Sequence, residues 1–158
     1  MNIHLMHAEE IEQMFHAFSG EPYNKTLSIF QEYFHEQQNG QQREVYIASS
    51  EGNIVGYITL VWHSPYPPFA EQQIPEIKDL NILVAYRRKG YAKKLIHHCE
   101  QRVRTAGFAT IGIGAGITPD YNPARHLYAS LGYISDDRGI HPDEWGGATY
   151  FTKTLSKK

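Results

Sequence analysis

The segment with the clearest chemical potential spans residues 79–93, where an apolar strand runs into a short basic turn and then a long helix. The first N–H groups of a helix have no partner within it, and with the positive end of the helix dipole they form an anion site. Gly90 and Ala92 carry little or no side chain, so a pyrophosphate could approach the backbone directly. Positive charge surrounds the turn on Arg87, Arg88, Lys89 and Lys93. An ordinary strand–turn–helix with solvated basic side chains fits the same pattern.

Two motifs of this chain resemble one enzyme superfamily. The run Arg87-x-x-Gly90-x-Ala92 after a strand is similar to the acyl-CoA signature Q/R-x-x-G-x-G/A of the GNAT N-acetyltransferases. A later run, residues 124–133, is similar to the family pattern A-x-x-L-Y-x-x-x-G-F/Y. The order of the remaining elements also fits, so the resemblance covers nearly the whole chain. The chain departs from the family at Arg88, where glycine is frequent, and at Tyr121, where asparagine is usual.

The resemblance implies acetyl-CoA as cosubstrate and a set of cofactor-binding residues. Backbone groups of one strand would face the pantetheine arm, in a gap where this strand and the next one splay apart. Main-chain amides of the turn and helix start would hold the pyrophosphate, beside the Arg87 side chain. The pantetheine set is Leu80, Asn81 and Ile82, and the pyrophosphate set is Arg88, Lys89, Gly90, Tyr91, Ala92 and Lys93.

Tyr128 is the general acid that the resemblance implies. When an amine displaces CoA from the thioester, the departing sulfur becomes a thiolate. A thiol of pKa ~8.5 and a phenol of pKa ~10 are close enough for proton transfer across a hydrogen bond. The alternative is a core aromatic, because Leu127 and Leu131 share the apolar stripe of the helix.

Glu76 is the predicted base, since it resembles the glutamate that histone acetyltransferases of this superfamily use. The attacking amine must be neutral, yet an alkylamine of pKa ~10 is mostly protonated at pH 7. The alternative for Glu76 is a carboxylate at the strand edge, solvated or paired with Lys78. Asp79 is a second candidate, which by strand alternation faces away from Glu76. The N–H of Ile82 would meet the developing oxyanion.

The elements that position these residues follow from apolar periodicity. Helical stripes occur over residues 11–18, 23–34, 92–103 and 124–131. Asn39 lies near the end of the second helix, Asn122 is predicted to cap the last one before Pro123, and Gly107 and Gly132 end two helices. Strands are predicted over residues 2–6, 45–49, 54–62, 74–84, 108–117, 133–135 and 148–155, with a Pro-containing loop over 63–73.

This order predicts a single domain, 1–158, of the α/β class with helices on both faces of a mixed sheet. By resemblance it is the GNAT acyl-CoA N-acyltransferase fold, a mostly antiparallel sheet of about seven strands flanked by about four helices.

Composition excludes several other classes of protein. Lys and Arg total 15 against 17 Asp and Glu, a net charge of −2, whereas nucleic-acid binders carry a strong basic excess. The one cysteine, Cys99, excludes an internal disulfide and suits a reducing, cytoplasmic compartment. No apolar run approaches ~20 residues and the first ten residues lack a basic n-region, so we expect neither a membrane span nor a signal peptide. The 9 histidines are scattered, and no metal site is predicted.

These observations predict an N-acetyltransferase that moves acetyl from acetyl-CoA to a primary amine of a small molecule or peptide, by direct attack in a ternary complex. The alternative is a non-catalytic acyl-CoA-binding sensor or regulatory module. Aromatic and acidic residues in segments 62–69 and 136–145 would suit a cationic acceptor, although they also fit ordinary exposed loops. Expected partners are the amine and, as in many such families, a second copy in a homodimer.

Overall fold

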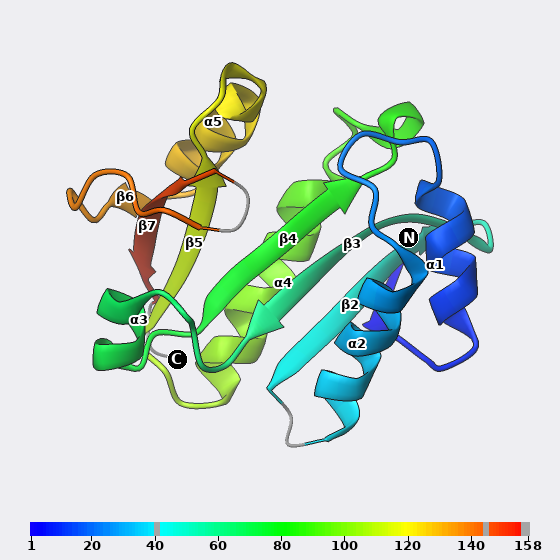
Figure 1. Cartoon of the computed structure of the whole chain (residues 1–158), viewed down its shortest axis with the longest axis horizontal. Helices are drawn as coiled ribbons and strands as arrows, with labels where there is room; N and C mark the ends of the chain where they lie inside the picture. Colours follow the sequence, from blue (N-terminus) through cyan, green and yellow to red (C-terminus); the bar gives the residue numbers. More distant parts are fainter. Residues whose placement is uncertain (40–41, 144–145, 156–158) are drawn as a thin grey trace. The chain divides into compact units, whose positions relative to one another are not determined.

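The computed structural model describes residues 1–39, 42–143 and 146–155 (Figure 1). The chain divides into two compact units, unit 1 with residues 1–62 and 78–99, and unit 2 with residues 63–77 and 100–158. Two elements, β4 (Glu76–Ile82) and α4 (Tyr91–Thr105), begin in one unit and end in the other. A single domain over 1–158 stays a prediction.

Unit 1 consists of β1 (Asn2–Leu5), α1 (Glu10–Phe18), α2 (Leu27–Gln38), β2 (Arg43–Ser50) and β3 (Asn53–Val61) with the adjoining parts of β4 and α4. Met14 and Phe18 of α1 and Phe30 of α2 are buried against Val45, Ile47 and Tyr57 of the strands. On β2 the next position along, Tyr46, faces the other way and contacts His98 of α4 at 4.4 Å between ring centroids. Helices therefore cover both faces of the strands in unit 1 (Figure 1).

The hairpin between β2 and β3 forms as its sequence predicts. Glu51 and Gly52 both have positive φ, +53° and +81°, which is the backbone that a tight two-residue hairpin turn requires. Ser50 pairs with Asn53 directly across this turn. The turn thereby fixes the register of two strands that supply much of the core.

Unit 2 consists of α3 (Pro67–Gln72), β5 (Thr110–Gly116), α5 (Asn122–Ser130), β6 (Ile134–Ser135) and β7 (Ala148–Thr154) with the adjoining parts of β4 and α4. The start of β4 pairs in parallel with β5 through Glu76–Gly112 and Ile77–Ile113, and β5 pairs antiparallel with β7. Tyr66, Phe69 and Tyr150 form a buried aromatic cluster beside these strands.

The fold class is confirmed. Within the described residues, a mixed sheet of seven strands has the hydrogen-bonded order β1-β2-β3-β4-β5-β7-β6, and five α-helices accompany it. The predicted strands and the four predicted helices are all present, with ends that differ by a few residues.

Three local predictions were wrong. Residues 63–73 were predicted as a loop but contain α3, because Pro67 and Pro68 occupy the first turn of the helix, where a missing N–H costs nothing. Tyr23 lies outside α2, at φ +61°, and Thr26 caps that helix by accepting from the N–H of Ile29 at 3.3 Å. Asn122 is itself helical, because the 3-10 turn Pro119–Tyr121 leads directly into α5.

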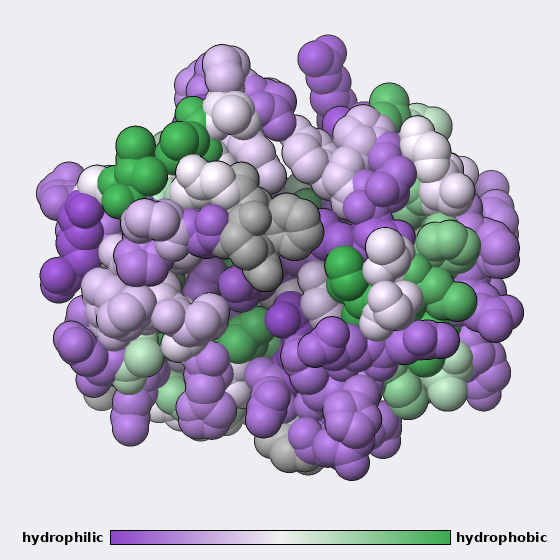
Figure 2. Space-filling model, viewed as in Figure 1, coloured by the Kyte–Doolittle hydropathy of each residue, from purple (hydrophilic) through white to green (hydrophobic). Residues whose placement is uncertain are grey.

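Most of the face seen in Figure 2 is hydrophilic. Large hydrophobic side chains with high exposure in unit 2 include Ile134 at 72% and Ile140 at 60%.

No helix among the described residues has both the length and the apolar character needed to cross a membrane.

Gly112 is required where β5 meets α3. A Cβ at this position would clash with ring carbons of Phe69. We expect Gly112→Ala to destabilise the protein by about 1–3 kcal/mol, the usual cost of overpacking a close-packed core. Urea denaturation followed by circular dichroism measures this loss. In a Phe69→Leu background the same substitution should cost less, and an equal cost in both backgrounds would contradict the proposed clash.

Candidate active site

The final part of β4 carries the predicted pantetheine residues, all of them in unit 1. Asn81 and Ile82 are buried, and Leu80 is half-buried. The side-chain amide nitrogen of Asn81 is buried and makes no hydrogen bond of normal geometry among the described residues, although it lies close enough to the Tyr57 hydroxyl to lower the pKa of that phenol. A buried amide this weakly engaged leaves room on the strand for an external acceptor.

Asp79 shapes this strand from within. Its φ is +67°, a left-handed conformation inside a β-strand that few non-glycine residues adopt. The carboxylate accepts hydrogen bonds from Tyr33 at 2.9 Å and Tyr57 at 3.1 Å, and lies 3.3 Å from the Lys25 ammonium. Burial, with the Asp79 charge as the next cause, raises the pKa of both tyrosines, so they remain donors. Asp79 is thus held as an anchor and is poorly placed for the role of second candidate base.

A short 3-10 helix, Val84–Tyr86, joins β4 to the predicted pyrophosphate turn. The Glu21 carboxylate accepts from the N–H of Val84 at 2.8 Å, and Arg87 Nε donates to the carbonyl of Ile82 at 3.0 Å. The Arg87 side chain therefore folds back on the end of β4 and fixes the exit of the chain toward the turn.

The turn itself has a left-handed backbone at two positions. Arg88 has φ +64° and Gly90 has φ +86°. The GNAT resemblance has glycine at both positions, so arginine here adopts the conformation that glycine would adopt. Nothing lies within 4 Å of the position where Gly90 would carry a Cβ, which leaves the backbone open to an approaching group.

Helix α4 starts directly after this turn. The carbonyl of Gly90 accepts from the N–H of Lys94 at 3.1 Å, which is the first turn of the helix, so the N–H groups of Tyr91, Ala92 and Lys93 precede the first intrahelical bond. The first turn contains no acidic residue, and the exposed cations Arg87, Arg88, Lys89 and Lys93 surround it. Open backbone, unpaired amides and positive charge fit a pyrophosphate.

Tyr128 lies on α5 in unit 2. Arg125 orients this helix by donating to the carbonyls of Gly116, the last residue of β5, and of Thr118 two residues beyond it. The Tyr128 side chain is 6% exposed and packs near the rings of Tyr133 and Phe151, but its hydroxyl has no hydrogen-bond partner among the described residues. Burial, and secondarily Tyr121, raises the pKa of this phenol, so it remains protonated well above neutral pH.

Glu76 lies in a different cluster of unit 2. It is 2% exposed and accepts a hydrogen bond from the Ser64 hydroxyl at 2.5 Å. Ser64 Oγ accepts in turn from the N–H of Tyr66 at 3.0 Å. Burial raises the pKa of Tyr150, with the negative charge of Glu76 as the second cause. Glu76 is therefore neither solvated nor at a free edge.

Tyr66 and Tyr150 stack at 3.7 Å between centroids, and the Tyr66 hydroxyl donates to Asp136 at 2.5 Å. Burial and this hydrogen bond raise the pKa of Tyr66 to about 12. Of the predicted acceptor wall, Tyr66, Phe69 and Asp136 thus come together in unit 2, whereas Trp62 donates to Glu44 in unit 1. Glu144 and Trp145 lie outside the described residues.

An open groove in unit 2 is lined by α3, the start of β5 and the end of β7. Phe69 and Asp136 of the predicted acceptor wall line it together with Arg138, but none of the predicted cofactor-binding or catalytic residues does. We therefore do not assign it to the cofactor.

Comparison with known proteins identifies the family. Residues 7–133 match the model of the Acetyltransferase (GNAT) family. The chain belongs to the GNAT acetyltransferase family. This membership confirms the predicted enzyme class, acetyl-CoA-dependent N-acetyltransferases, and acetyl-CoA as the cosubstrate of that class.

Individual relatives agree with this assignment. The uncharacterized N-acetyltransferase YsnE of Bacillus subtilis is 31% identical over 80 residues, which are 51% of this chain. The chain spans about half, 53%, of the length of that curated relative. The ribosomal-protein-S18-alanine N-acetyltransferase of Escherichia coli superposes with a TM-score of 0.72 at 15% identity, over 99% of this chain and 95% of its own. An aminoglycoside 6'-N-acetyltransferase complexed with coenzyme A superposes with a TM-score of 0.72 at 18% identity, over 100% of this chain and 99% of its own.

The sequence did not reveal which residues hold the candidate site residues Glu76 and Tyr128 in place. Ser64 lies in a Pro-containing stretch and Tyr150 in a late strand, and neither carries a local motif. Arg125 sits inside the second motif, but its bonds to backbone carbonyls of β5 have no signature in sequence. Only contacts between distant segments could have identified them.

The left-handed backbone at Arg88 yields a test of the turn. Binding that depends on backbone shape rather than on the guanidinium predicts different results for two variants. Arg88→Gly should keep acetyl-CoA affinity within about threefold of the wild type. Arg88→Val should lower the affinity about tenfold or more, because β-branched residues resist positive φ. Lys94→Val, on the exposed side of α4, controls for the lost charge and the β-branched side chain. Isothermal titration calorimetry with acetyl-CoA provides the affinities. Equal losses for Arg88→Gly and Arg88→Val would assign the role to the guanidinium instead.

Proposed function

We propose that this chain transfers the acetyl group of acetyl-CoA to a primary amine by direct attack within a ternary complex. The observation that carries the proposal is the Tyr128 phenol, which is buried, protonated and without a hydrogen-bond partner among the described residues. A purely structural tyrosine at 6% exposure usually pairs its hydroxyl. An unpaired phenol is available to the atom that departs in the reaction.

In this proposal acetyl-CoA supplies the activated acetyl thioester, and residues of the chain hold and protonate its parts. Leu80, Asn81 and Ile82 present groups to the pantetheine arm, and the buried, weakly engaged Asn81 amide is the donor that supports this. The Ile82 N–H donates to the developing oxyanion. The pyrophosphate binds the amides of Arg88 to Lys93, beside Arg87.

Proton transfers complete the reaction. The amine nitrogen bonds to the acetyl carbon while the carbon–sulfur bond breaks, and Tyr128 gives its proton to the sulfur. Glu76 takes the proton that the amine loses. Because Glu76 is 2% exposed, we infer that water relays this proton.

Direct attack is favoured over a covalent enzyme intermediate by the surroundings of the one cysteine. Cys99 is fully buried on α4 among the apolar residues of its stripe. A nucleophilic thiol needs an accessible, electropositive site, which this position does not offer.

The acceptor that fits best is a cationic primary amine of a small molecule or peptide. Stacked Tyr66 and Tyr150 lie beside Asp136 and Glu76, and aromatic faces with carboxylates attract ammonium groups. The neighbours named above act, by their names, on a ribosomal-protein alanine and on aminoglycosides. A cytoplasmic location and a homodimer stay predictions, the first resting on the single cysteine.

Tyr128→Phe tests the proposed acid. We expect kcat to fall by about 100-fold, within the usual range for a general acid, while acetyl-CoA affinity stays nearly constant. Stability should change little because the hydroxyl has no protein partner to lose. Thiol release monitored with a panel of amines measures kcat, and calorimetry measures affinity.

The matched control is Tyr133→Phe. The Tyr133 hydroxyl donates to buried Glu100 at 2.8 Å, and Lys153 lies 3.1 Å from the same carboxylate. This variant should lose about 1.5–3 kcal/mol of stability but keep its turnover. A Tyr128→Phe enzyme at full rate would remove Tyr128 from the mechanism. Acetyl-CoA binding without thiol release for any amine would favour the sensor alternative.

Glu76→Gln tests the proposed base. Gln can still accept from Ser64, so the fold should hold, but it cannot take a proton. The acid limb of the pH–rate profile should therefore disappear and kcat at neutral pH should fall about 100-fold. Glu71→Gln, on the exposed face of α3, should leave the profile unchanged. An acid limb that persists in Glu76→Gln would exclude Glu76 as the base.

A further inference from the structure

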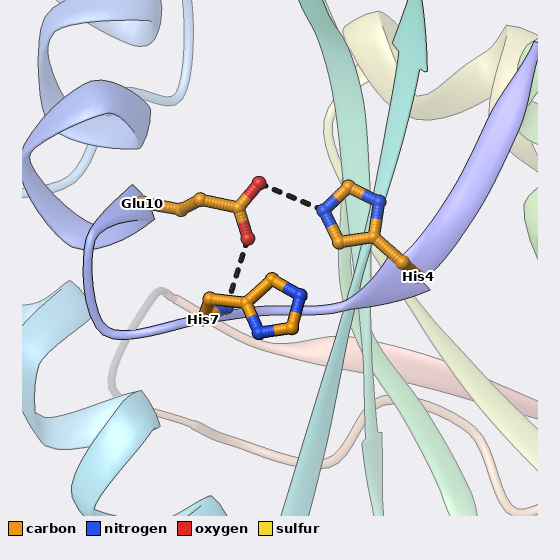
Figure 3. A group of neighbouring side chains, drawn as sticks. All are labelled: His4, His7 and Glu10. Atoms are coloured by element: carbon orange, nitrogen blue, oxygen red, sulfur yellow. Dashed lines mark hydrogen bonds and ion pairs between the residues drawn. The ribbon is translucent and has the colours of Figure 1, made fainter.

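Three potential metal ligands meet at the junction of β1 and α1 in unit 1, apart from every residue of the proposed reaction. His4 lies on β1, His7 in the connection that follows, and Glu10 is the first residue of α1 (Figure 3). Their spacing of three residues does not by itself predict a metal site. The turn from β1 into α1 brings the three side chains together. Figure 3 shows the two rings and the carboxylate converging on one another.

The donor atoms are close. One ligand atom from each of the three side chains lies within 4.8 Å of the others. His4 Nε2 and Glu10 Oε2 are 2.7 Å apart, and the two imidazole rings stack at 5.5 Å with 17° between their planes. The His4 and Glu10 side chains are 24% and 15% exposed, while His7 is exposed.

The Glu10 carboxylate is already oriented for ligation. Its Oε1 accepts from the backbone N–H of His7 at 2.8 Å, and the Glu10 N–H donates to the His7 carbonyl at 2.9 Å. These reciprocal bonds hold one oxygen against the backbone and turn the other, Oε2, toward the imidazoles. A hydrogen-bonded carboxylate of this kind is a common feature of metal sites.

A capping interaction with a histidine–glutamate pair would explain part of this arrangement. It does not explain His4 Nδ1, which is buried and lacks a hydrogen-bond partner among the described residues. A structural histidine at this depth usually has both nitrogens satisfied. The His4 ring is thus not held by a complete network, and its pairing with Glu10 can be exchanged for another bond.

We propose that His4, His7 and Glu10 bind one divalent transition-metal ion, with Zn²⁺ as the probe. Two imidazoles and one carboxylate are a donor set that Zn²⁺ accepts, at bond lengths of ~2.0–2.2 Å. Tetrahedral bonds of that length place ligand atoms roughly 3.3 Å apart. A modest rotation of the exposed His7 side chain and a slightly larger separation of His4 from Glu10 would bring the three ligand atoms to that spacing. The three ligands leave one position for water. The ion would clamp the end of β1 to the start of α1.

Calorimetry of the untagged chain, freed of metal with a chelator, tests the site by titration with Zn²⁺. One ion per chain is expected, with a rise in Tm on saturation. His7→Ala keeps the backbone N–H that holds Glu10, and Glu10→Gln keeps the capping bond, so both should remain folded by circular dichroism. Each should weaken Zn²⁺ binding about tenfold or more.

His16→Ala is the matched control, an exposed histidine in the last turn of α1 that should leave affinity unchanged. Co²⁺ provides a second readout, since its visible absorption on binding should be lost in His7→Ala. The proposal is overturned if the wild-type chain takes up no Zn²⁺ at tens of micromolar. It is equally overturned if both ligand variants bind Zn²⁺ like the wild type, which would assign the ion to other histidines.

Discussion

The end of β4, where the cofactor is proposed to bind, depends on the interactions of the Asp79 carboxylate. Asp79 holds a left-handed backbone in the middle of β4, a conformation that costs on the order of 1 kcal/mol or more for a non-glycine residue. Two phenols and an ammonium, from α2, β3 and the segment between α1 and α2, bind its two oxygens and offset that cost. This conformation interrupts the extended backbone of β4 one residue before Leu80, Asn81 and Ile82.

Two polar groups of the proposed site are only weakly engaged by the protein. The Asn81 amide makes no hydrogen bond of normal geometry, and the hydroxyl of the largely buried Tyr128 side chain has no hydrogen-bond partner among the described residues. Unpaired buried polar groups reduce stability, and such exceptions concentrate where a ligand completes the pairing. One lies on the strand proposed to meet pantetheine, and the other is the proposed acid. The burial that leaves Tyr128 unpaired also raises its pKa, which keeps the proton available for transfer.

Glu76 and Tyr128 divide the proposed proton chemistry between two environments of unit 2. Glu76 is fixed by Ser64 and lies among the tyrosines Tyr66 and Tyr150, so its surroundings are polar and aromatic. The Tyr128 ring lies near Tyr133 and Phe151, and its hydroxyl has no hydrogen-bond partner within the described part of the chain. A base benefits from hydrogen bonds that hold its carboxylate in place, whereas an acid benefits from a hydroxyl that nothing else engages.

Local patterns in the sequence determined the elements, because the helical and strand periods of apolar residues, glycine stops and the Glu51–Gly52 turn act over a few neighbours. They also determined the family, through Arg87-x-x-Gly90-x-Ala92 and the Tyr128 motif, since backbone shape and helix starts are local properties. Tertiary structure decided the rest. Asp79 adopts a left-handed conformation within β4, where its carboxylate is held by Tyr33, Tyr57 and Lys25 from other segments, and α3 formed where prolines suggested a loop. The burial of Glu76 depended on its contacts with Ser64 and Tyr150. The meeting of His4, His7 and Glu10 depended on the turn between β1 and α1. Contacts of this kind form between side chains that the fold brings together, and they produce no periodic pattern in the sequence.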